Sequence, residues 1–526
     1  MNTIARSRFG LTASLGAIAL MAGLNACNPQ ENPLKPDTAR HNSARVSASD
    51  VQFFALTDDN RLNKKSVGNP MSNLSDTPIT GLQEGEKLLA IDFRPATGQL
   101  YGLGSTSRLY VIDQETGVAR AIGMGSFSPA LSGDAVGFDF NPTVDLIRVV
   151  TNTGQNLRLN PNTGALQPGG EDGMINGGMS PMISAVAYTN SRGVSSSTTL
   201  YDIDPASDRL YIQNPPNNGT LVNVGPLGID ISGTAGFDIS SDNSQALVAY
   251  WAGGKSELGR INLMTGALQK IGDLGAKTYI GLAIPTDPVA YAVSGNNLLI
   301  FNPWELNPTL RTITGLQPGE TIRGIDMRPA TGQLYALGSS SRIYTISYPA
   351  GTTNAQVNLV GSGAFTPALT GSDYGFDFNP VADRIRVISN TGQNLRINPT
   401  TAEVAVDGSL NFGAMAVDKP VVRASAYTNN FAGATSTVLY NIDDLNDKLY
   451  RQIPPNDGTQ AGGSPLGINV AATSGFDIGG RSNKAYALLT SGGTTKLYNI
   501  DLNNGMLTDL GTFPTTVRGF ALGLGF

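Results

Sequence analysis

The amino-acid sequence predicts an all-β fold of the β-propeller type, built from two copies of one repeat unit. Short segments in which hydrophobic and polar residues alternate lie between turns rich in Gly, Pro, Asn and Asp, and helix-type periodicity is scarce. The second half of the chain repeats the first half. Inside each half a shorter repeat recurs at roughly 43 to 51 residues, which is the length of a four-stranded propeller blade.

The chain begins with a segment that has the layout of a cleaved export signal. Arg6 and Arg8 form a short basic region, and the run from Phe9 to Leu24 is apolar but too short for a comfortable membrane span. The four residues that end at Cys27 resemble the bacterial lipobox. The resemblance implies that residues 1–26 are removed and that Cys27 becomes the lipidated first residue. The alternative is an ordinary signal peptide with an incidental cysteine.

Cys27 is the only cysteine of the chain, so no internal disulfide can form. A free thiol is a liability in an oxidising compartment, which suggests that this sulfur carries lipid and anchors the protein to a membrane. Asn28 follows Cys27 where, by analogy with lipoproteins, an Asp would favour retention at the inner membrane. We therefore expect an exported, membrane-anchored protein of the outer membrane or cell surface, with residues 27–50 as a flexible tether.

The overall composition restricts the partners. Charged residues make up 14% of the chain, the formal net charge is −6, and no basic stripe is present, so nucleic acid is not expected as a partner. No second long apolar run follows the export signal, so no further membrane-spanning segment is expected.

The long-range duplication is visible as matching segments. The matching pairs are Arg94–Tyr101 with Arg328–Tyr335, Gly137–Pro142 with Gly375–Pro380, Asn152–Arg158 with Asn390–Arg396, and Ala187–Asn190 with Ala426–Asn429. We expect two domains, residues 51–285 and 289–526, each of which is one copy of the unit.

One blade of the first copy illustrates the shorter repeat. The predicted strands are Leu89–Phe93, Gln99–Leu103, Arg108–Asp113 and Val118–Ile122. Alternation with a period of two places successive side chains on opposite faces of a sheet, and Gly at the turns supplies the positive φ that tight turns need. One such sheet cannot cover both of its faces, whereas sheets stacked around an axis bury them and leave only short edges.

The number of blades follows from the first strand of each blade, which carries a central Asp or Ala. These central residues are Asp92, Asp139, Ala187, Asp238 and Ala283 in the first copy, and Asp326, Asp377, Ala426, Asp477 and Ala521 in the second. The pattern predicts two five-bladed rings of four-stranded blades. Each ring is expected to close when its last strand pairs with a strand at the start of the same copy. The pairs are Ile280–Ile284 with Phe53–Leu56, and Gly519–Leu524 with Ala290–Val293. One ten-bladed ring is the alternative, because the first copy runs almost directly into the second.

The longest motifs resemble bacterial domain-of-unknown-function family 4394. They are Asp92–Tyr101, Gly137–Pro142 with Asp145 and Ile147–Val149, and Gly154–Pro161 in the first copy, and Asp326–Tyr335, Gly375–Pro380 with Asp383 and Ile385–Val387, and Gly392–Pro399 in the second. The second copy departs at Met327, where the first has Phe93, and the first departs at Leu146, where the second has Arg384. The resemblance covers almost the whole mature chain. It implies exported proteins with repeats of this kind and supplies no activity.

The residue types in the folded part exclude several catalytic chemistries. The single histidine, His41, lies in the predicted tether, so a Ser-His-Asp triad, a Cys-His pair and a His-based zinc or iron site are not expected. Carboxylate, Tyr, Lys and Arg chemistry remains, together with metals bound wholly by oxygen. We assign no catalytic residue, no cofactor and no metal site from the sequence.

The first-strand aspartates are the most conspicuous carboxylates. They are Asp92, Asp139 and Asp238 in the first copy and Asp326, Asp377 and Asp477 in the second. Innermost strands line a propeller channel, and repetition at the same point of several blades indicates side chains that tie neighbouring turns together. We therefore expect channel-lining or structural carboxylates. A catalytic pair of the glycosidase type and a cation site are the alternatives.

Polar residues beside the turn at residues 152–155 and its counterpart at 390–393 are the best candidates for ligand binding, because they lie in loops and are identical in both copies. They are Asn156, Arg158, Asn394 and Arg396. Arg148 and Arg386 lie mid-strand among aliphatic residues and are expected to form internal ion pairs. The expected partners are Asp139 or Asp145 for Arg148, and Asp377 or Asp383 for Arg386.

These observations favour a non-catalytic, membrane-anchored extracytoplasmic binding or scaffold protein whose ligand is a glycan or a protein. A carboxylate-dependent enzyme acting on envelope or external polysaccharide is the alternative, and a purely structural or adhesive surface component is a further one.

Overall fold

The computed structural model describes residues 50–178, 180–193, 195–348, 352–471 and 474–526. The predicted signal peptide, the predicted lipidation site Cys27 and all of the predicted tether except Asp50 lie outside the described residues. Within the described part of the chain, no helix combines the length and the apolar character that a membrane crossing requires.

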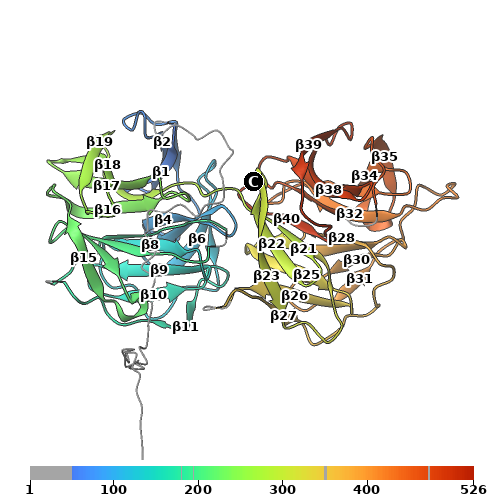
Figure 1. Cartoon of the computed structure of the whole chain (residues 1–526), viewed down its shortest axis with the longest axis horizontal. Helices are drawn as coiled ribbons and strands as arrows, with labels where there is room; N and C mark the ends of the chain where they lie inside the picture. Colours follow the sequence, from blue (N-terminus) through green and yellow to red (C-terminus); the bar gives the residue numbers. More distant parts are fainter. Residues whose placement is uncertain (1–49, 179, 194, 349–351, 472–473) are drawn as a thin grey trace, which may run out of the picture.

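The first copy folds into five four-stranded antiparallel sheets, drawn blue to green in Figure 1. In sheet order the strands are β20 (Tyr279–Ala283), β1 (Gln52–Thr57), β2 (Arg61–Ser66) and β3 (Ser75–Pro78); β4 (Leu88–Arg94), β5 (Gln99–Gly104), β6 (Arg108–Ile112) and β7 (Ala119–Ile122); β8 (Val136–Asn141), β9 (Leu146–Thr151), β10 (Asn156–Leu159) and β11 (Leu166–Glu171); β12 (Ala185–Tyr188), β13 (Leu200–Asp204), β14 (Arg209–Gln213) and β15 (Leu221–Pro226); and β16 (Ser232–Ile239), β17 (Ala246–Ala252), β18 (Lys255–Ile261) and β19 (Leu268–Gly275). A single turn of 3-10 helix, η1 (Pro216–Asn218), precedes β15.

The second copy repeats this plan, drawn yellow to red in Figure 1. Its strands are β40 (Phe520–Leu522), β21 (Ala290–Ser294), β22 (Asn297–Asn302) and β23 (Glu305–Thr314); β24 (Ile322–Arg328), β25 (Gln333–Gly338), β26 (Arg342–Ser347) and β27 (Ala355–Val360); β28 (Tyr374–Asn379), β29 (Arg384–Ser389), β30 (Asn394–Ile397) and β31 (Val404–Val406); β32 (Val422–Tyr427), β33 (Leu439–Asp443), β34 (Lys448–Gln452) and β35 (Gln460–Pro465), with η2 (Pro455–Asp457) between the last two; and β36 (Ser474–Ile478), β37 (Ala485–Ser491), β38 (Thr494–Ile500) and β39 (Leu507–Thr512). A short parallel pairing of β23 with β27 joins the first two sheets into one of eight strands.

The last strand of each copy completes the sheet that the first strand of the same copy begins. β20 pairs antiparallel with β1, and β40 pairs antiparallel with β21, so both predicted closing pairs are confirmed. The inner strands of successive sheets contact one another, in the order β4, β8, β12, β16 and β20, and β20 contacts β4 again. The result is a propeller-like arrangement of four-stranded sheets in each copy.

The inner strands are buried on both faces because each lies between two neighbouring sheets. In β4, every residue is buried except Leu89, which is partly buried. Aromatic rings fill the space between sheets at equivalent points of the two copies. Tyr101 packs edge-on against Phe140 with 5.1 Å between ring centroids, and Tyr335 packs against Phe378 at the same distance. Burial of such side chains from water on both faces is what stabilises sheets that would be marginal alone.

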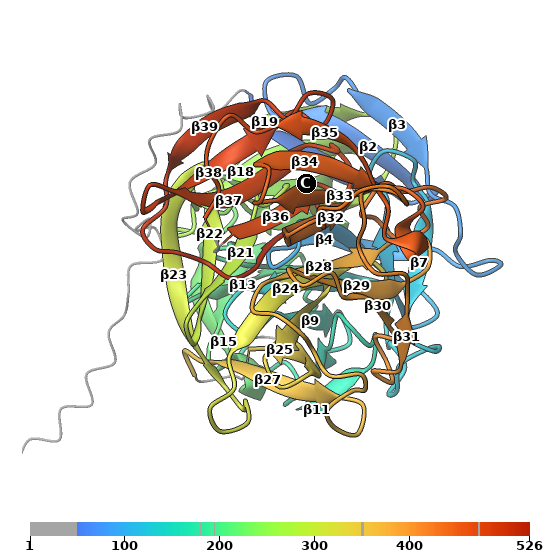
Figure 2. The ribbon, with the colours of Figure 1, turned by 90° about the vertical axis from the view of Figure 1, so that its right-hand side faces the viewer.

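The duplicated turn between β4 and β5 carries much of the contact between the copies. Bonds across this contact run from Arg94 Nη1 to Gly332 O (3.3 Å), from the Tyr291 hydroxyl to Ala96 O (2.8 Å) and from Gly525 N to Thr97 O (2.8 Å). Gly98 lies in this turn at φ +72°, and a Cβ there would lie 3.3 Å from the Cα of Gly525, so both the turn and the close approach require glycine. Figure 2 views the molecule from its right-hand side, with the second copy in front of the first.

Candidate functional site

The six predicted first-strand aspartates come together in two groups of three, which we call the aspartate triads. Asp92, Asp139 and Asp238 form the triad of the first copy, and the carboxylate oxygens that they offer lie within 4.8 Å of one another. Asp326, Asp377 and Asp477 form the same arrangement in the second copy. All six side chains are at most 3% exposed. The sequence therefore identified the right residues, and the structure shows that they converge in the interior of each copy.

Each triad carboxylate binds the backbone of the next sheet. Asp92 Oδ2 accepts a bond from the amide of Phe140, Asp139 Oδ1 from Tyr188, and Asp238 Oδ2 from Ile284, at 2.9, 3.1 and 2.6 Å. The second copy repeats these bonds from Phe378 to Asp326, from Tyr427 to Asp377 and from Leu522 to Asp477. The expected structural role, a tie between neighbouring sheets, is thus visible in the hydrogen bonds.

Burial also decides the protonation of the triads. It raises the pKa of Asp92 and of Asp139 well above the usual range, and the charges of the neighbouring triad carboxylates raise both pKa values further. Burial raises the pKa of Asp238, and of Asp477 in the second copy, to about 7. Carboxylates this close cannot all be ionised, so each triad must hold protons or an oxygen-coordinated cation. Five of the six oxygens in the first triad already accept backbone N–H bonds, which lower the pKa values and so oppose part of the rise that burial causes.

Arg148 and Arg386 form internal ion pairs, as predicted, but the predicted partners are wrong. Arg148 donates to Asp172 Oδ2 at 2.6 Å, to Asn156 Oδ1 at 2.8 Å and to Asn217 Oδ1 at 2.7 Å. Arg386 makes the equivalent bonds to Asp407, Asn394 and Asn456. The nearer acidic residues are engaged elsewhere. Asp139 and Asp377 belong to the triads, while Asp145 and Asp383 pair with the arginines at the ends of β4 and β24, namely Arg94 and Arg328.

The four predicted ligand-binding residues lie in this same network. Asn156 is 1% exposed and donates from Nδ2 to the carbonyls of Gly173 and Pro216, both at 3.0 Å. Arg158 is partly exposed and binds both carboxylate oxygens of Asp172 at 2.8 Å. Asn394 and Arg396 are placed in the same way in the second copy. Their identity in both copies is therefore explained by internal bonds, and ligand binding by Arg158, the one that also faces a cavity, stays a prediction.

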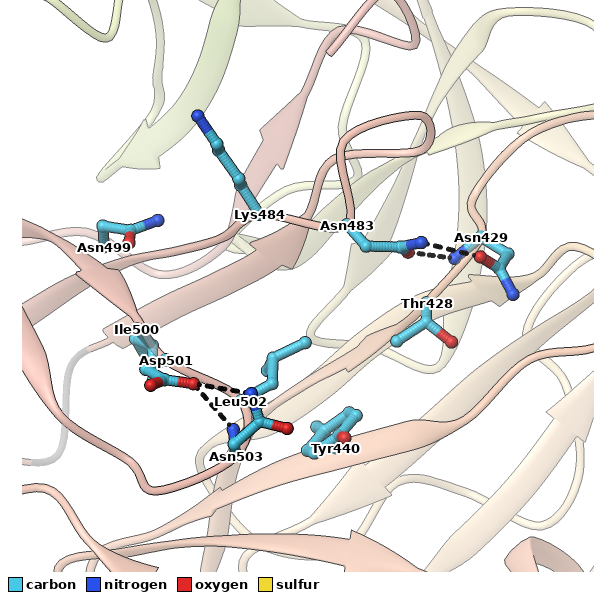
Figure 3. A pocket seen from close by; sticks show the side chains of 10 residues that line it. All are labelled: Thr428, Asn429, Tyr440, Asn483, Lys484, Asn499, Ile500, Asp501, Leu502 and Asn503. Carbon is cyan, nitrogen blue, oxygen red and sulfur yellow. Dashed lines mark hydrogen bonds between the residues drawn. The ribbon is translucent and has the colours of Figure 1, made fainter.

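A shallow polar groove lies between the last two sheets of the second copy (Figure 3). Its volume is about 620 Å³. Asn429 and Asn483 exchange two hydrogen bonds of 2.8 Å at its edge, and Asp501 Oδ1 accepts bonds from the backbone and side chain of Asn503. The first copy has a smaller counterpart of about 380 Å³ beside Asn243. These polar groups bind one another, and the hydrogen bonds at the edge of the groove link the two sheets.

A second cavity of about 530 Å³ lies between the two copies and is walled by both of them. The first copy contributes residues of the hairpin that joins β10 to β11, such as Asn160, Asn162 and Gln167, and the second contributes Gln333 and Tyr348 among others. Arg94 and Asp145, which bind each other, lie on its wall. Sequence reasoning singled out one residue of this cavity, Arg158, and the repeated motif Arg94–Tyr101 lies beside it, but neither signal indicated that the two copies enclose a cavity together.

Comparison with known proteins gives a family and one distant structural likeness. A profile for a domain of unknown function, DUF4394, matches residues 61–283 and again residues 297–521. No curated protein matches the sequence. Among solved structures, a similar chain was described in the structural and functional probing of PorZ, an essential bacterial surface component of the type-IX secretion system of Porphyromonas gingivalis, with 9% identity and a TM-score of 0.24.

The alignment with that structure covers 88% of this chain, which spans only 58% of the length of the other. The family profile, in contrast, matches nearly all of both repeats. The chain therefore belongs to the DUF4394 family and carries the domain in two tandem copies.

Proposed function

We propose that the protein is a non-catalytic binding or scaffold protein, held on the extracytoplasmic side of a membrane by a lipid on Cys27. The observation that supports a non-catalytic role is the burial and hydrogen bonding of the aspartate triads. All six carboxylates are buried and bonded to backbone amides of the next sheet, so they are not presented to a polymer substrate as an acid and base pair. The cavity between the copies, by contrast, is open to a ligand of moderate size.

We also propose that each copy closes as its own five-bladed propeller, in preference to one ten-bladed ring. Support comes from the pairing of β20 with β1 and of β40 with β21, since each pairing joins the two ends of one copy. In a ten-bladed ring, the last strand of one copy would instead complete a sheet of the other. Electron microscopy of the purified protein distinguishes two small rings from one large ring.

The binding function is tested by thermal unfolding of the purified chain against glycans, cell-wall fragments and divalent cations. A ligand at about 100 times its Kd stabilises the state that binds it by roughly 2.7 kcal/mol, which for a domain of this size is a rise of a few degrees in Tm. We expect a reproducible rise with one class of ligand. If no compound in the panel shifts Tm and no protein partner is captured from envelope extracts, the binding function is refuted.

The anchor is tested separately by changing Cys27→Ser in the full-length chain. We expect the unaltered protein to partition with membranes and to incorporate labelled fatty acid. The variant should lose the label and appear in the soluble extracytoplasmic fraction. Membrane association that survives the substitution would contradict the lipid anchor.

A carboxylate-dependent enzyme acting on polysaccharide is the second candidate, and the convergence of the triad carboxylates is the observation that favours it. Asp139→Asn and Asp377→Asn distinguish the two functions. An enzyme would lose turnover while the variants stay folded. For a binding protein, the same variants change stability and leave ligand affinity intact.

A further inference from the structure

We infer that the cavity between the copies is the ligand-binding site and that it binds a neutral oligosaccharide, one per chain. This rests on the proposed function as a binding protein and adds the site and the class of ligand. The cavity is formed by residues of both copies, so it is not duplicated even though the domain is. Its volume of about 530 Å³ is in the usual range for small-molecule sites.

Both arginines that line the cavity are paired with carboxylates. Arg94 binds both carboxylate oxygens of Asp145, at 2.8 and 2.5 Å, and Arg158 binds both oxygens of Asp172. A guanidinium held by two parallel bonds to one carboxylate has little attraction left for a second anion. A phosphorylated or carboxylated ligand would therefore gain no unpaired positive charge from these arginines.

Side-chain amides are the polar groups that remain available. Asn162 lines the cavity, and its side-chain amide has no hydrogen-bond partner within the described residues, although its Oδ1 atom lies buried below the cavity wall. The side chains of Gln167 and Gln333 face the same cavity, and the described part of the chain gives neither amide an internal hydrogen bond. Each amide offers an acceptor oxygen and two N–H donors. A sugar hydroxyl also offers both a donor and an acceptor, so the hydroxyls of a sugar can pair with these side-chain amides.

An aromatic ring completes the wall. Tyr348 is partly exposed, and the guanidinium of Arg311 lies 5.1 Å from the centre of its ring. The face of such a ring packs against the C–H groups of a sugar while the amides bind its hydroxyls, because a sugar ring combines an apolar face with a polar edge. This combination of one partly exposed aromatic ring, unpaired amides and two lining arginines already paired with carboxylates fits a neutral oligosaccharide better than an anionic one.

The second copy provides conservative substitutions for the test. Thr400 and Ala405 occupy the sequence positions in the second copy that Asn162 and Gln167 occupy in the first, and the two hairpins pair alike next to the turn, with Leu159 opposite Leu166 and Ile397 opposite Val404. The double variant Asn162→Thr with Gln167→Ala therefore introduces residues that this hairpin already accommodates. The control variant is Thr400→Ala, which changes the equivalent point away from the cavity.

The experiment is isothermal titration of the full-length protein in detergent with neutral malto-, cello-, xylo- and chito-oligosaccharides, and with oligogalacturonate as the anionic probe. We expect one neutral oligosaccharide to bind with a stoichiometry of one per chain. The double variant should weaken binding by roughly tenfold or more, because about two hydrogen bonds are lost, while Thr400→Ala leaves Kd unchanged.

Three results would overturn the inference. One is neutral oligosaccharide binding that the double variant does not weaken, and another is binding of the anionic probe alone. The third is the absence of any oligosaccharide binding by a protein that shifts its Tm with a peptide or protein ligand. In that third case the proposed binding function stands and only this site assignment fails. If no ligand of any class binds, both fail together.

Discussion

The two copies place the same strands around equivalent aspartate triads, yet they differ at one buried position beside the Arg148 network. The first copy has Asp202 in β13 and the second has Asn441 in β33, and both side chains are fully buried. Asn441 Nδ2 donates to Oε1 of Gln452 and of Gln460 at 2.7 and 2.9 Å. Neither carboxylate oxygen of Asp202 has a hydrogen-bond partner within the described residues.

The difference arises because the first copy lacks the second amide. Leu221 pairs with Gln213 at the point where Gln460 pairs with Gln452. Burial then raises the pKa of Asp202 well above its usual range, although the charge of Arg148 opposes the rise. The first copy thus accommodates a carboxyl group by keeping its proton, whereas the second uses an uncharged amide. The two copies share their motifs and their strands. They differ in how each keeps a buried polar side chain uncharged.

The largest effect should come from a feature that the copies share. Asp172→Asn and Asp407→Asn remove the carboxylates that face the buried guanidinium groups, and each variant should lose about 3 to 5 kcal/mol of unfolding free energy. Urea denaturation measures the loss. Asp509→Asn is the control, because its pair with Lys496 is exposed to solvent and screened, so its loss should change the unfolding free energy little. A large loss in one copy and none in the other would show that the two networks are not equivalent.

The triads should give both copies the same pH dependence. Burial raises the pKa of Asp238 and of Asp477 to about 7, so the protonated folded form is favoured and this stability is complete near pH 4. It is lost as the pH rises from about 4 through 7, by up to about 4 kcal/mol for Asp238 and for Asp477, each taken alone. Denaturation between pH 5 and 9 should show the decline, and Asp238→Asn or Asp477→Asn should flatten it. Stabilisation by Ca²⁺ at pH 8 that both substitutions abolish would instead indicate a cation.

Asp202→Asn should remove a pH dependence that is present in the first copy alone. Because the pKa of Asp202 is raised, its contribution falls as the pH rises, and the amide should stabilise the first copy by about 1 to 3 kcal/mol at pH 8. Hydrogen exchange should slow in β12 to β15 and stay unchanged in β32 to β35. The reverse change, Asn441→Asp, should destabilise the second copy by a similar amount. A variant Asp202→Asn that is less stable at pH 8 would refute a protonated Asp202.

The smallest effect is expected where paired asparagines join the loops that follow the innermost strands of two neighbouring sheets. Asn190→Ala and Asn429→Ala each remove two side-chain hydrogen bonds, one to the partner asparagine and one to a backbone carbonyl, and place Ala at a φ near +57° and +55°. Each should cost about 1 kcal/mol, with little change in the rest of the copy. A rise in local exchange at this edge, measured by mass spectrometry, checks it. Equal exchange in variant and unaltered protein would mean that the pair contributes nothing.

The strands were predictable because their signals are local. The predicted strands Leu89–Phe93 and Val118–Ile122 correspond to β4 and β7 within a residue at each end, since alternation and turn glycines act over a few positions. The triad residues were also found, because they repeat at the same point of the inner strands. The partners of Arg148 were not, since Asn217 lies 69 residues away in the next sheet and Asp172 follows a strand whose register shifts.

The cavity between the copies was equally beyond sequence reasoning. It depends on how two folded units lie against each other, and no period or motif within one unit records that placement. Asn162 and Gln167 differ from their counterparts in the second copy, but a single difference between repeats does not by itself indicate a site.

The pairing of β20 with β1 also determines when the first copy can complete its fold as the chain is made. Phe54 pairs with Ala283, so the inner edge of β1 has no partner until about 230 further residues have been synthesised. An exposed strand edge is a template for aggregation with other chains. The unpaired edge of β1 is therefore open to wrong partners over this interval, and the same interval recurs between β21 and β40 in the second copy.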